Sequence, residues 1–362
     1  MSSLHILSQK LLPKQALTRL AGLGARHEGG ALTTWVIRRF IDHYRVDMQE
    51  AAEPDPAAYR SFNEFFTRAL REDARPVADS ALVCPVDGTV SQLGAVQDGR
   101  IIQAKGHRYS ATALLGGDER LAAPFADGQF ATIYLSPRDY HRIHMPCAGQ
   151  LRQMIYVPGE LYSVSPATAA GIPGLFARNE RVVCLFEGAF GPWALVLVGA
   201  TIVGSMATVW HGTVNPPRHE RIQRWIYPAA PVLAGRDAGD AAGTAGAGSA
   251  GAGAAGTGAA GTGESGTGEA GAAEVGFAAA QGAPASSAKG VMPPVDLTAI
   301  GPVLFSGGVH QESTPVHLDR GQEMGRFMLG STVVMLFPQG APALNGAWQP
   351  GQGVRMGEAM SA

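Results

Sequence analysis

The sequence has few cysteines and almost no net charge. Its three cysteines, Cys84, Cys147 and Cys184, show no C-x-x-C spacing, which excludes a disulfide framework and a cysteine-based zinc site and indicates a reducing compartment. We expect each of them to be a small buried hydrophobe. The formal net charge of −2 argues against a general nucleic-acid-binding surface, so no nucleic-acid partner is expected.

The sequence also lacks a clear secretory signal and a convincing membrane span. Its first residues show no basic region followed by a long apolar stretch. Residues 188–210 carry no charge and are numerous enough to cross a bilayer, but Pro192, Gly199 and Gly204 divide them. The pieces "WALVLV" and "ATIV" have the length and composition of strands, so we expect two buried strands joined at a glycine.

The N-terminal region, residues 1–75, has a helical pattern. A first helix is predicted from Pro13 toward Gly22 or Gly24, where a glycine would end it. Such a basic amphipathic segment is typical of a helix on an anionic membrane surface, and equally of a helix docked on its own domain. Its apolar and basic residues are Ala16, Leu17, Leu20, Leu23, Lys10, Lys14, Arg19 and Arg26.

A second helix is predicted in "SFNEFFTRAL". Ser61 and Glu64 are three residues apart, which is a capping-box pattern. The apolar residues that follow have helical spacing and are expected to face a core: Phe62, Phe65, Phe66, Ala69 and Leu70.

Residues 76–234 and 291–362 have the pattern of a β-rich domain, in which short apolar runs alternate with Gly, Pro and Asp turns. Residues 235–290 interrupt it with an almost pure Gly, Ala, Ser and Thr tract. This tract cannot bury enough apolar area to become ordered, so a flexible surface insertion is predicted. Closing a longer loop costs only about 0.6 kcal/mol per doubling of its length, so a fold tolerates it.

Three short stretches contain residues with potential chemistry. Gly330 and Ser331 in "LGST" precede the apolar run "VVMLF", where an isolated glycine predicts a bend at a strand entrance. Asp87 lies in "CPVDGTV", and His141 and His144 lie in "RDYHRIHMP". Each stretch also fits an ordinary turn or a structural histidine.

Together, an aspartate, a histidine and a serine permit nucleophile activation, because a base must take the serine proton and a carboxylate orients that base. The chain order Asp87, His144, Ser331 occurs in one class of serine hydrolase, but the G-x-S-x-G elbow of the α/β-hydrolases is missing. Two alternatives remain open from the residues alone. One is a serine hydrolase with an intact Ser331, and the other is a non-enzymatic β-rich adaptor on membrane surfaces.

A series of motifs covers most of the chain outside the Gly/Ala tract: "SFNEFFTRAL", "CPVDGTV", "QAKGHRYS", "RDYHRIHMPCAG", "IYVPGELYSV", "VGATIVGSMATVWHGTV" and "EMGRFMLGSTVV". In this order, the series resembles the bacterial phosphatidylserine decarboxylases. The resemblance implies an α+β fold that is predominantly antiparallel β, of the barrel-sandwich hybrid kind, with N-terminal amphipathic helices.

The resemblance implies self-cleavage between Gly330 and Ser331, giving a β chain of residues 1–330 and an α chain of residues 331–362. His144, oriented by Asp87, would take the proton of Ser331, and Ser331 would become a covalent pyruvoyl group. This group would be the only cofactor, with no metal and no external cofactor. His141 is the candidate for handling protons or positioning the substrate carboxylate.

The resemblance also implies the substrate and the location. Phosphatidylserine in the bilayer would be converted to phosphatidylethanolamine and CO₂ through a Schiff base. We therefore expect a peripheral protein on the cytoplasmic face of the bacterial cell membrane, with interfacial helices before Gly29 and over residues 34–44. A homodimer of processed αβ units is implied as well. A decarboxylase for a related serine lipid remains a narrower alternative.

Overall fold

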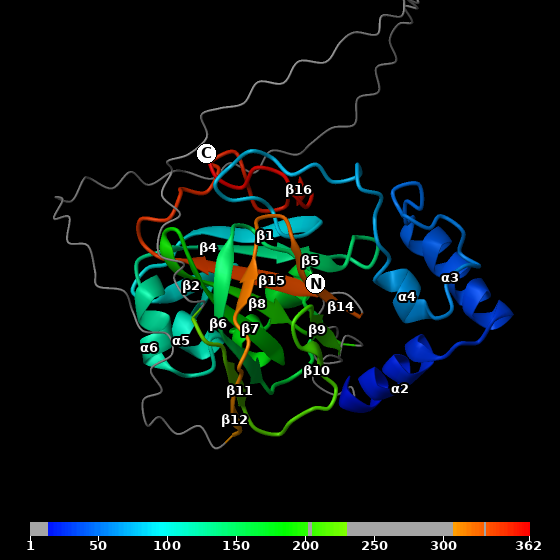
Figure 1. Cartoon of the computed structure of the whole chain (residues 1–362), viewed down its shortest axis with the longest axis horizontal. Helices are drawn as coiled ribbons and strands as arrows, with labels where there is room; N and C mark the ends of the chain where they lie inside the picture. Colours follow the sequence, from blue (N-terminus) through cyan, green and yellow to red (C-terminus); the bar gives the residue numbers. More distant parts are fainter. Residues whose placement is uncertain (1–13, 202–204, 230–306, 329–330) are drawn as a thin grey trace, which may run out of the picture. The chain divides into compact units, whose positions relative to one another are not determined.

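The structure is a computed structural model that describes residues 14–201, 205–229, 307–328 and 331–362. The Gly/Ala-rich insertion predicted at 235–290 lies outside the described residues, and so does Gly330. In the described part, the longest helices belong to the N-terminal region, and strands predominate from β1 to the C-terminus (Figure 1). The fold is therefore mixed α+β, with a large and mainly antiparallel sheet.

Two helices open the described chain, α2 (Lys14–Arg26) and α3 (Ala31–Tyr44). The predicted stop of the first helix at Gly22 or Gly24 is wrong, because α2 includes both glycines and continues to Arg26. A single glycine in a helix costs only about 1 kcal/mol, which does not end it. By contrast, α3 ends where Arg45 adopts a left-handed conformation with φ of 56°.

The apolar stripe of α2 faces outward. Leu20 and Leu23 are 67% and 65% exposed, whereas Lys14 and Thr18 on the same helix are buried. Lys14 attaches the helix to the β-rich body, since its Nζ lies 3.4 Å from a Glu160 carboxylate oxygen and over the ring of Tyr162. The helix thus docks through a polar side and leaves its apolar side uncovered in the described structure.

The third N-terminal helix, α4 (Phe62–Phe66), is shorter than predicted. The Ser61 hydroxyl accepts from the Glu64 N–H at 3.2 Å, as a capping box requires, but Glu64 accepts from the N–H of Arg60 instead of Ser61. The prediction that Ala69 and Leu70 continue the helical stripe is wrong. Their backbone leaves the helix because it pairs with residues 51 and 52.

The strands of the described residues form a ten-stranded sheet in the order β12-β11-β6-β7-β8-β15-β4-β1-β16, with β13 also on β6, a four-stranded sheet β10-β9-β14-β5 and a hairpin β2-β3. All pairs are antiparallel except β11 with β12. The large sheet is open in the described part, so the barrel-sandwich arrangement stays a prediction. The strands are β1 (Gly88–Ala95), β2 (Arg100–Ala104), β3 (His107–Ser110), β4 (Gln129–Tyr134), β5 (Arg142–His144), β6 (Gly149–Val157), β7 (Arg181–Gly188), β8 (Gly191–Val198), β9 (Met206–Thr208), β10 (Gly212–Asn215), β11 (Gln223–Ile226), β12 (Val309–Gln311), β13 (Val316–Leu318), β14 (Glu323–Phe327), β15 (Thr332–Phe337) and β16 (Gly353–Val354).

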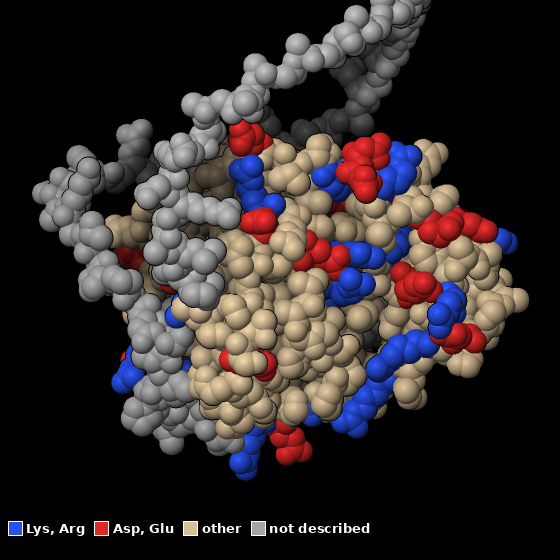
Figure 2. Space-filling model, in the orientation of Figure 1, with Lys and Arg blue, Asp and Glu red and all other residues tan. Residues whose placement is uncertain are grey.

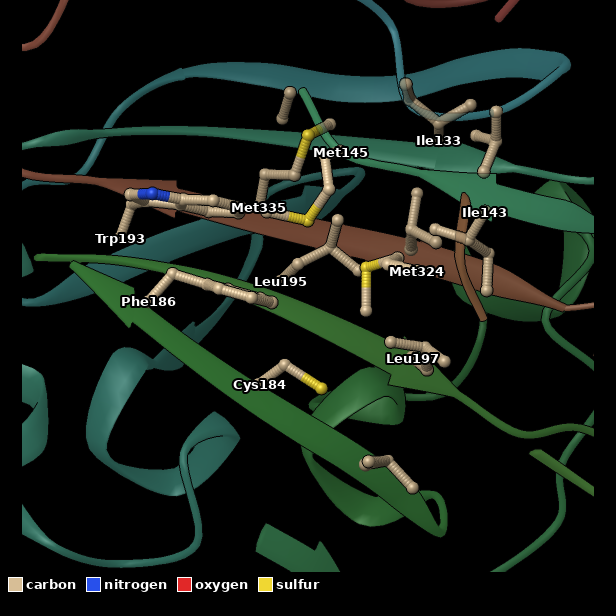
Figure 3. Close-up of a cluster of buried hydrophobic side chains, with 14 of the residues drawn as sticks. Ile133, Ile143, Met145, Cys184, Phe186, Trp193, Leu195, Leu197, Met324 and Met335 are labelled. Atoms are coloured by element: carbon tan, nitrogen blue, oxygen red, sulfur yellow. The ribbon is translucent and has the colours of Figure 1, made fainter. Parts of the chain in front are cut away.

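The central strands are buried on both faces, which explains their unbroken apolar runs. In β15, Val333 and Met335 join a core that also contains Met324 of the four-stranded sheet, while Val334 and Leu336 join a second core on the other face. Figure 3 shows side chains of the first core, packed between the strands of the two sheets. The short helices that contribute to the second core are α5 (Ala111–Leu114), α6 (Glu119–Ala122), η1 (Ala123–Phe125), α7 (Pro166–Ala169) and α8 (Leu175–Arg178).

The uncharged stretch 188–210 contains strand β8, as predicted for "WALVLV". The predicted second strand, "ATIV", lies partly outside the described residues, at 202–203. None of the helices in the described part of the chain is long and apolar enough to cross a membrane. The three cysteines are buried and free, as expected from their spacing.

Candidate functional site

Three neighbouring strands bring two of the predicted residues to one end of the large sheet. Strand β4 lies between β1 and β15, and its last residue, Tyr134, is the partner of both Thr89 and Thr332. Asp87 immediately precedes β1, and Ser331 immediately precedes β15. The sheet register therefore places these two residues, 244 positions apart in the chain, on either side of the end of β4.

The two histidines enter the same region from β5 and the loop before it. The backbone N–H of His144 donates to the Pro85 carbonyl at 2.8 Å, two residues before Asp87. The His141 carbonyl accepts from the N–H of Phe327 at 3.0 Å, near the end of β14. The structure thus gathers the segments that carry all four predicted side chains, whereas Gly330 lies outside the described residues.

Ser331 is completely buried at the start of β15. Its carbonyl accepts from the N–H of Leu135 at 2.9 Å, which fixes its backbone beside the end of β4. Its hydroxyl has no hydrogen-bond partner within the described part of the chain. A buried polar atom without a partner costs about 1–3 kcal/mol, and such an atom in a native structure calls for an explanation. A nucleophile poised for reaction is one such explanation.

His144 is held as a neutral base. Its Nδ1 lies 2.8 Å from the Gly321 carbonyl, which can only accept, so Nδ1 carries the proton and Nε2 carries a lone pair. The Tyr140 hydroxyl lies 3.0 Å from Nε2. Burial raises the pKa of Tyr140 to about 12, so this hydroxyl stays protonated and donates. Burial also lowers the pKa of His144 below its ordinary value.

Asp87 is bound by Arg75 and not by His144. The Nε of Arg75 donates to the two carboxylate oxygens at 2.9 and 3.1 Å, and the N–H of Met356 donates to one of them at 2.9 Å. Both ring nitrogens of His144 are occupied by Gly321 and Tyr140. The orientation of His144 by Asp87 therefore stays a prediction, as does the proton transfer from Ser331, since no hydrogen bond joins these described side chains.

His141 is completely buried and neutral. Its Nδ1 donates to the Asp139 carbonyl at 2.7 Å, and its Nε2 has no partner among the described residues. Burial is the main cause that lowers the pKa of His141 to about 3. The ring lies against Phe66, with ring centroids 4.1 Å apart. Within the described residues, the Nε2 of His141 is therefore an acceptor without a partner, in the same region as the Ser331 hydroxyl, which also has none.

An apolar cavity of about 970 Å³ adjoins these residues. Its wall includes Tyr134 and Leu135 from the end of β4, and Phe66, which also contacts His141. Side chains of α2, α3 and α4 form much of the remaining wall. Neither this cavity nor the roles of Arg75, Tyr140 and Gly321 could be predicted from the sequence, because only the folded chain brings them to the site.

We predict that Arg75→Met destabilises the fold strongly. Arg75 and Asp87 are almost completely buried, so the variant leaves a carboxylate in the interior without a cation. Breaking such a pair costs about 3–5 kcal/mol in the free energy of unfolding, which denaturant titration measures. Arg355→Gln is the control, since Arg355 is 62% exposed in its ion pair and its loss costs below about 1 kcal/mol. Equal small losses in the free energy of unfolding for both variants would show that the fold does not depend on the pairing of Asp87 with Arg75.

Comparison with known proteins gives a consistent family. A family model described as phosphatidylserine decarboxylase matches residues 62–362, and a second, described as PSD, matches residues 4–45. The chain is 51% identical over 360 residues to the phosphatidylserine decarboxylase proenzyme of Chromobacterium violaceum, covering 99% of each chain. It is 50% identical over 358 residues to that of Polaromonas naphthalenivorans, covering 99% of this chain and 96% of the relative.

Proposed function

The chain belongs to the phosphatidylserine decarboxylase family, and from this premise we propose that it cuts its own backbone between Gly330 and Ser331. Its activity is that of a carboxy-lyase, which removes CO₂ from phosphatidylserine and leaves phosphatidylethanolamine. Its relatives are named proenzymes, which fits a chain that is made uncut. The observation that carries the proposed cleavage is the buried hydroxyl of Ser331 at the start of β15, which has no hydrogen-bond partner among the described residues.

The cleavage uses groups of the chain itself. His144 takes the Ser331 proton at Nε2, the Ser331 oxygen attacks the Gly330 carbonyl carbon, and the amide nitrogen of Ser331 leaves with a proton. The resulting ester loses the Cα proton of residue 331, and its Cβ–O bond breaks to release a carboxylate at Gly330. Water then replaces the nitrogen on residue 331, and ammonia departs. Glycine favours this attack because it has no side chain to block the carbonyl.

The product at position 331 is a pyruvoyl group, and the surroundings of Ser331 suit it. A ketone there takes up the substrate amine and draws electrons from Cα as CO₂ leaves. The N–H of Leu135 donates to the carbonyl of residue 331 and so holds its backbone, and Leu135 also lines the apolar cavity. The new chain end is therefore fixed next to a space that suits a lipid.

We assign proton handling to His141. An ammonium group must lose a proton before its nitrogen can attack a ketone. Because the Nδ1 proton of His141 is donated to Asp139, its Nε2, which has no partner among the described residues, is an acceptor that can bind and orient this amine group. A histidine whose pKa burial lowers to about 3 starts each turnover neutral. The pairing of Asp87 with His144 would require the Asp87 carboxylate to share its contacts with Arg75.

The apolar cavity of about 970 Å³ suits the acyl part of the substrate. Next to it, Leu20 and Leu23 of α2 and Leu32 and Trp35 of α3 are each more than 60% exposed. Exposed leucine and tryptophan side chains beside basic residues are typical of helices that lie in a membrane interface. These helices support a peripheral association with the cytoplasmic face of the membrane, where the processed units would form a homodimer.

We predict that the double variant Leu20→Ser/Trp35→Ser loses membrane affinity. The two side chains are 67% and 64% exposed, so their removal should leave the fold intact. Each buried apolar side chain contributes about 1.5–3 kcal/mol, so partition into phosphatidylserine vesicles should weaken at least about tenfold, as sedimentation measures. Val309→Ser, at a 44% exposed residue on β12, is the control. Unchanged partition of the double variant would show that these helices do not bind the membrane interface.

The proposed function is tested by incubating the purified protein with phosphatidylserine labelled in its carboxyl group. Release of labelled CO₂, together with an equal amount of phosphatidylethanolamine, is the expected result. A serine hydrolase would instead release fatty acid or serine and leave the label in solution. An adaptor would bind the vesicles and release none of these products. Either outcome, from a folded protein that binds vesicles, would overturn the proposal.

A further inference from the structure

A second and smaller cavity, of about 320 Å³, lies between α2 and the segment that leads to Ser331. Its wall includes Met328, three residues before Ser331, and Ser205, whose carbonyl accepts from the Met328 N–H at 3.0 Å. Leu23 of α2 lines both this cavity and the large apolar cavity. The two cavities therefore adjoin each other. The large cavity is lined by Leu135, whose N–H donates to the Ser331 carbonyl, and the smaller one by Met328, three residues before Ser331.

The wall of the smaller cavity is strongly basic. It contains three arginines, of which Arg19 and Arg26 are two turns apart on one face of α2. Neither of these two forms an ion pair with a carboxylate within the described residues. Figure 2 shows basic side chains along the position of α2. Positive charge without carboxylate partners, at the wall of a cavity, indicates an anionic ligand.

The third arginine, Arg218, is held in place by a buried carboxylate. Its Nε donates to Glu180 at 3.0 Å, and Glu180 also accepts from the Tyr156 hydroxyl at 2.8 Å and from the Asn215 amide. Glu180 is only 2% exposed. The network fixes the direction of the Arg218 guanidinium before any ligand binds, which lowers the entropy cost of binding.

One further polar group in this wall lacks a partner in the described structure. Asn63 lines the cavity, and its Oδ1 is buried without a hydrogen-bond partner. The two ends of an asparagine amide exchange by a half-turn of the side chain, so Asn63 can present N–H groups to an anion. Arginine forks and amide N–H groups are the donors that recognise phosphate oxygens.

We propose that the smaller cavity binds the phosphate of the phosphatidylserine headgroup, with Arg19 and Arg26 as its main cationic contacts. This inference rests on the proposed function. In the substrate, a short covalent link, P–O–Cβ–Cα, joins the phosphate to the carbon that loses CO₂. A phosphate site must therefore lie near residue 331, and the wall of this cavity reaches Met328, three residues before Ser331 in the chain. The acyl chains would continue past Leu23 into the apolar cavity.

The test uses the double variant Arg19→Gln/Arg26→Gln with two substrates in neutral detergent micelles. One is phosphatidylserine, and the other is O-hexadecylserine, which keeps the amine, carboxylate and apolar tail but has no phosphate. Loss of charged hydrogen bonds to phosphate should lower kcat/KM for phosphatidylserine about tenfold to hundredfold and leave that for the ether unchanged. The control, Arg108→Gln/Arg120→Gln, removes two exposed arginines outside the cavity and should change neither value.

Other outcomes overturn the inference. Equal losses on both substrates would mean that the arginines support the fold or the common reaction. A variant that differs from wild type only when phosphatidylglycerol vesicles are added would assign the cavity to the phosphate of a second lipid. Intact mass of every variant reports self-cleavage separately. An uncut wild type that releases no CO₂ would overturn the proposed function itself. A variant that is cut normally but shows the same kcat/KM as wild type on both substrates would overturn only the phosphate site.

Discussion

Replacement of Ser331 by alanine is expected to leave the chain in one piece and to abolish CO₂ release. Intact-mass analysis of the wild type should give two chains, 1–330 and 331–362, the smaller lighter by one ammonia than its serine form. The reason is chemical, because Ser331 supplies both the attacking oxygen and the carbon atoms of the ketone. Its hydroxyl has no hydrogen bond to lose within the described residues, so the variant should fold normally.

Thr332→Val is the matched control for this variant. Thr332 is the next residue, is also completely buried, and its hydroxyl also lacks a hydrogen-bond partner in the described part of the chain. Valine has nearly the same shape, so the control removes a neighbouring hydroxyl without removing the proposed nucleophile. We expect this variant to be cut. An uncut wild-type chain whose Ser331 reacts with a fluorophosphonate would instead identify a serine hydrolase.

His144→Gln is expected to slow self-cleavage about a hundredfold to ten-thousandfold, the usual contribution of a general base. Glutamine can still donate to the Gly321 carbonyl, but it cannot take the Ser331 proton. In the wild type, the cleavage rate should be constant at neutral pH and fall as the pH drops through the pKa of His144. Because burial lowers this pKa below 6.5, the midpoint should lie below that value. Mixing experiments on freshly folded precursor would measure the rate.

The same pH profile distinguishes the two histidines. A cleavage rate that stays constant down to about pH 3 would indicate that His141 is the general base, because burial lowers its pKa to about that value. The folded fraction must be followed in parallel by circular dichroism. Below pH 6.5 an unfolded chain protonates His141 while the folded chain does not, so stability also declines as the pH falls. A fall in rate that merely follows the folded fraction would contradict the role of His144.

The sequence allowed the chemistry to be predicted better than the architecture. Runs such as "VVMLF" indicated buried strands because β15 is covered on both faces, and burial on both faces removes the polar alternation. Sheet order was not predictable, since it depends on pairings such as β15 with β4 across nearly 200 residues. The predicted ends of α2 and α4 were wrong because docking and backbone pairing outweigh local helix propensity.

For the candidate site, the motifs identified the segments but not their contacts. Asp87 and His144 do lie on adjoining segments, yet Arg75 and Met356 occupy the carboxylate. Nothing in the pattern around Arg75 distinguishes it from an ordinary surface arginine. The sequence also did not show which way the apolar side of α2 faces, because an apolar helical stripe fits both a protein core and a membrane interface. The burial of Lys14 and the exposure of Leu20 show only that this side does not face the core of the described chain, and its contact with a membrane stays a proposal.

The position of β15 between β4 and β8 has a consequence for refolding. Before the cut, this strand folds as part of one chain, at a rate that does not depend on protein concentration. After the proposed cut, a denatured molecule would have to recapture a separate peptide of 32 residues, so its refolding would become bimolecular and slow on dilution. If the proposed cleavage occurs, the uncut precursor would therefore be the form that refolds efficiently, and the persistence of the cut molecule would depend on its rate of unfolding.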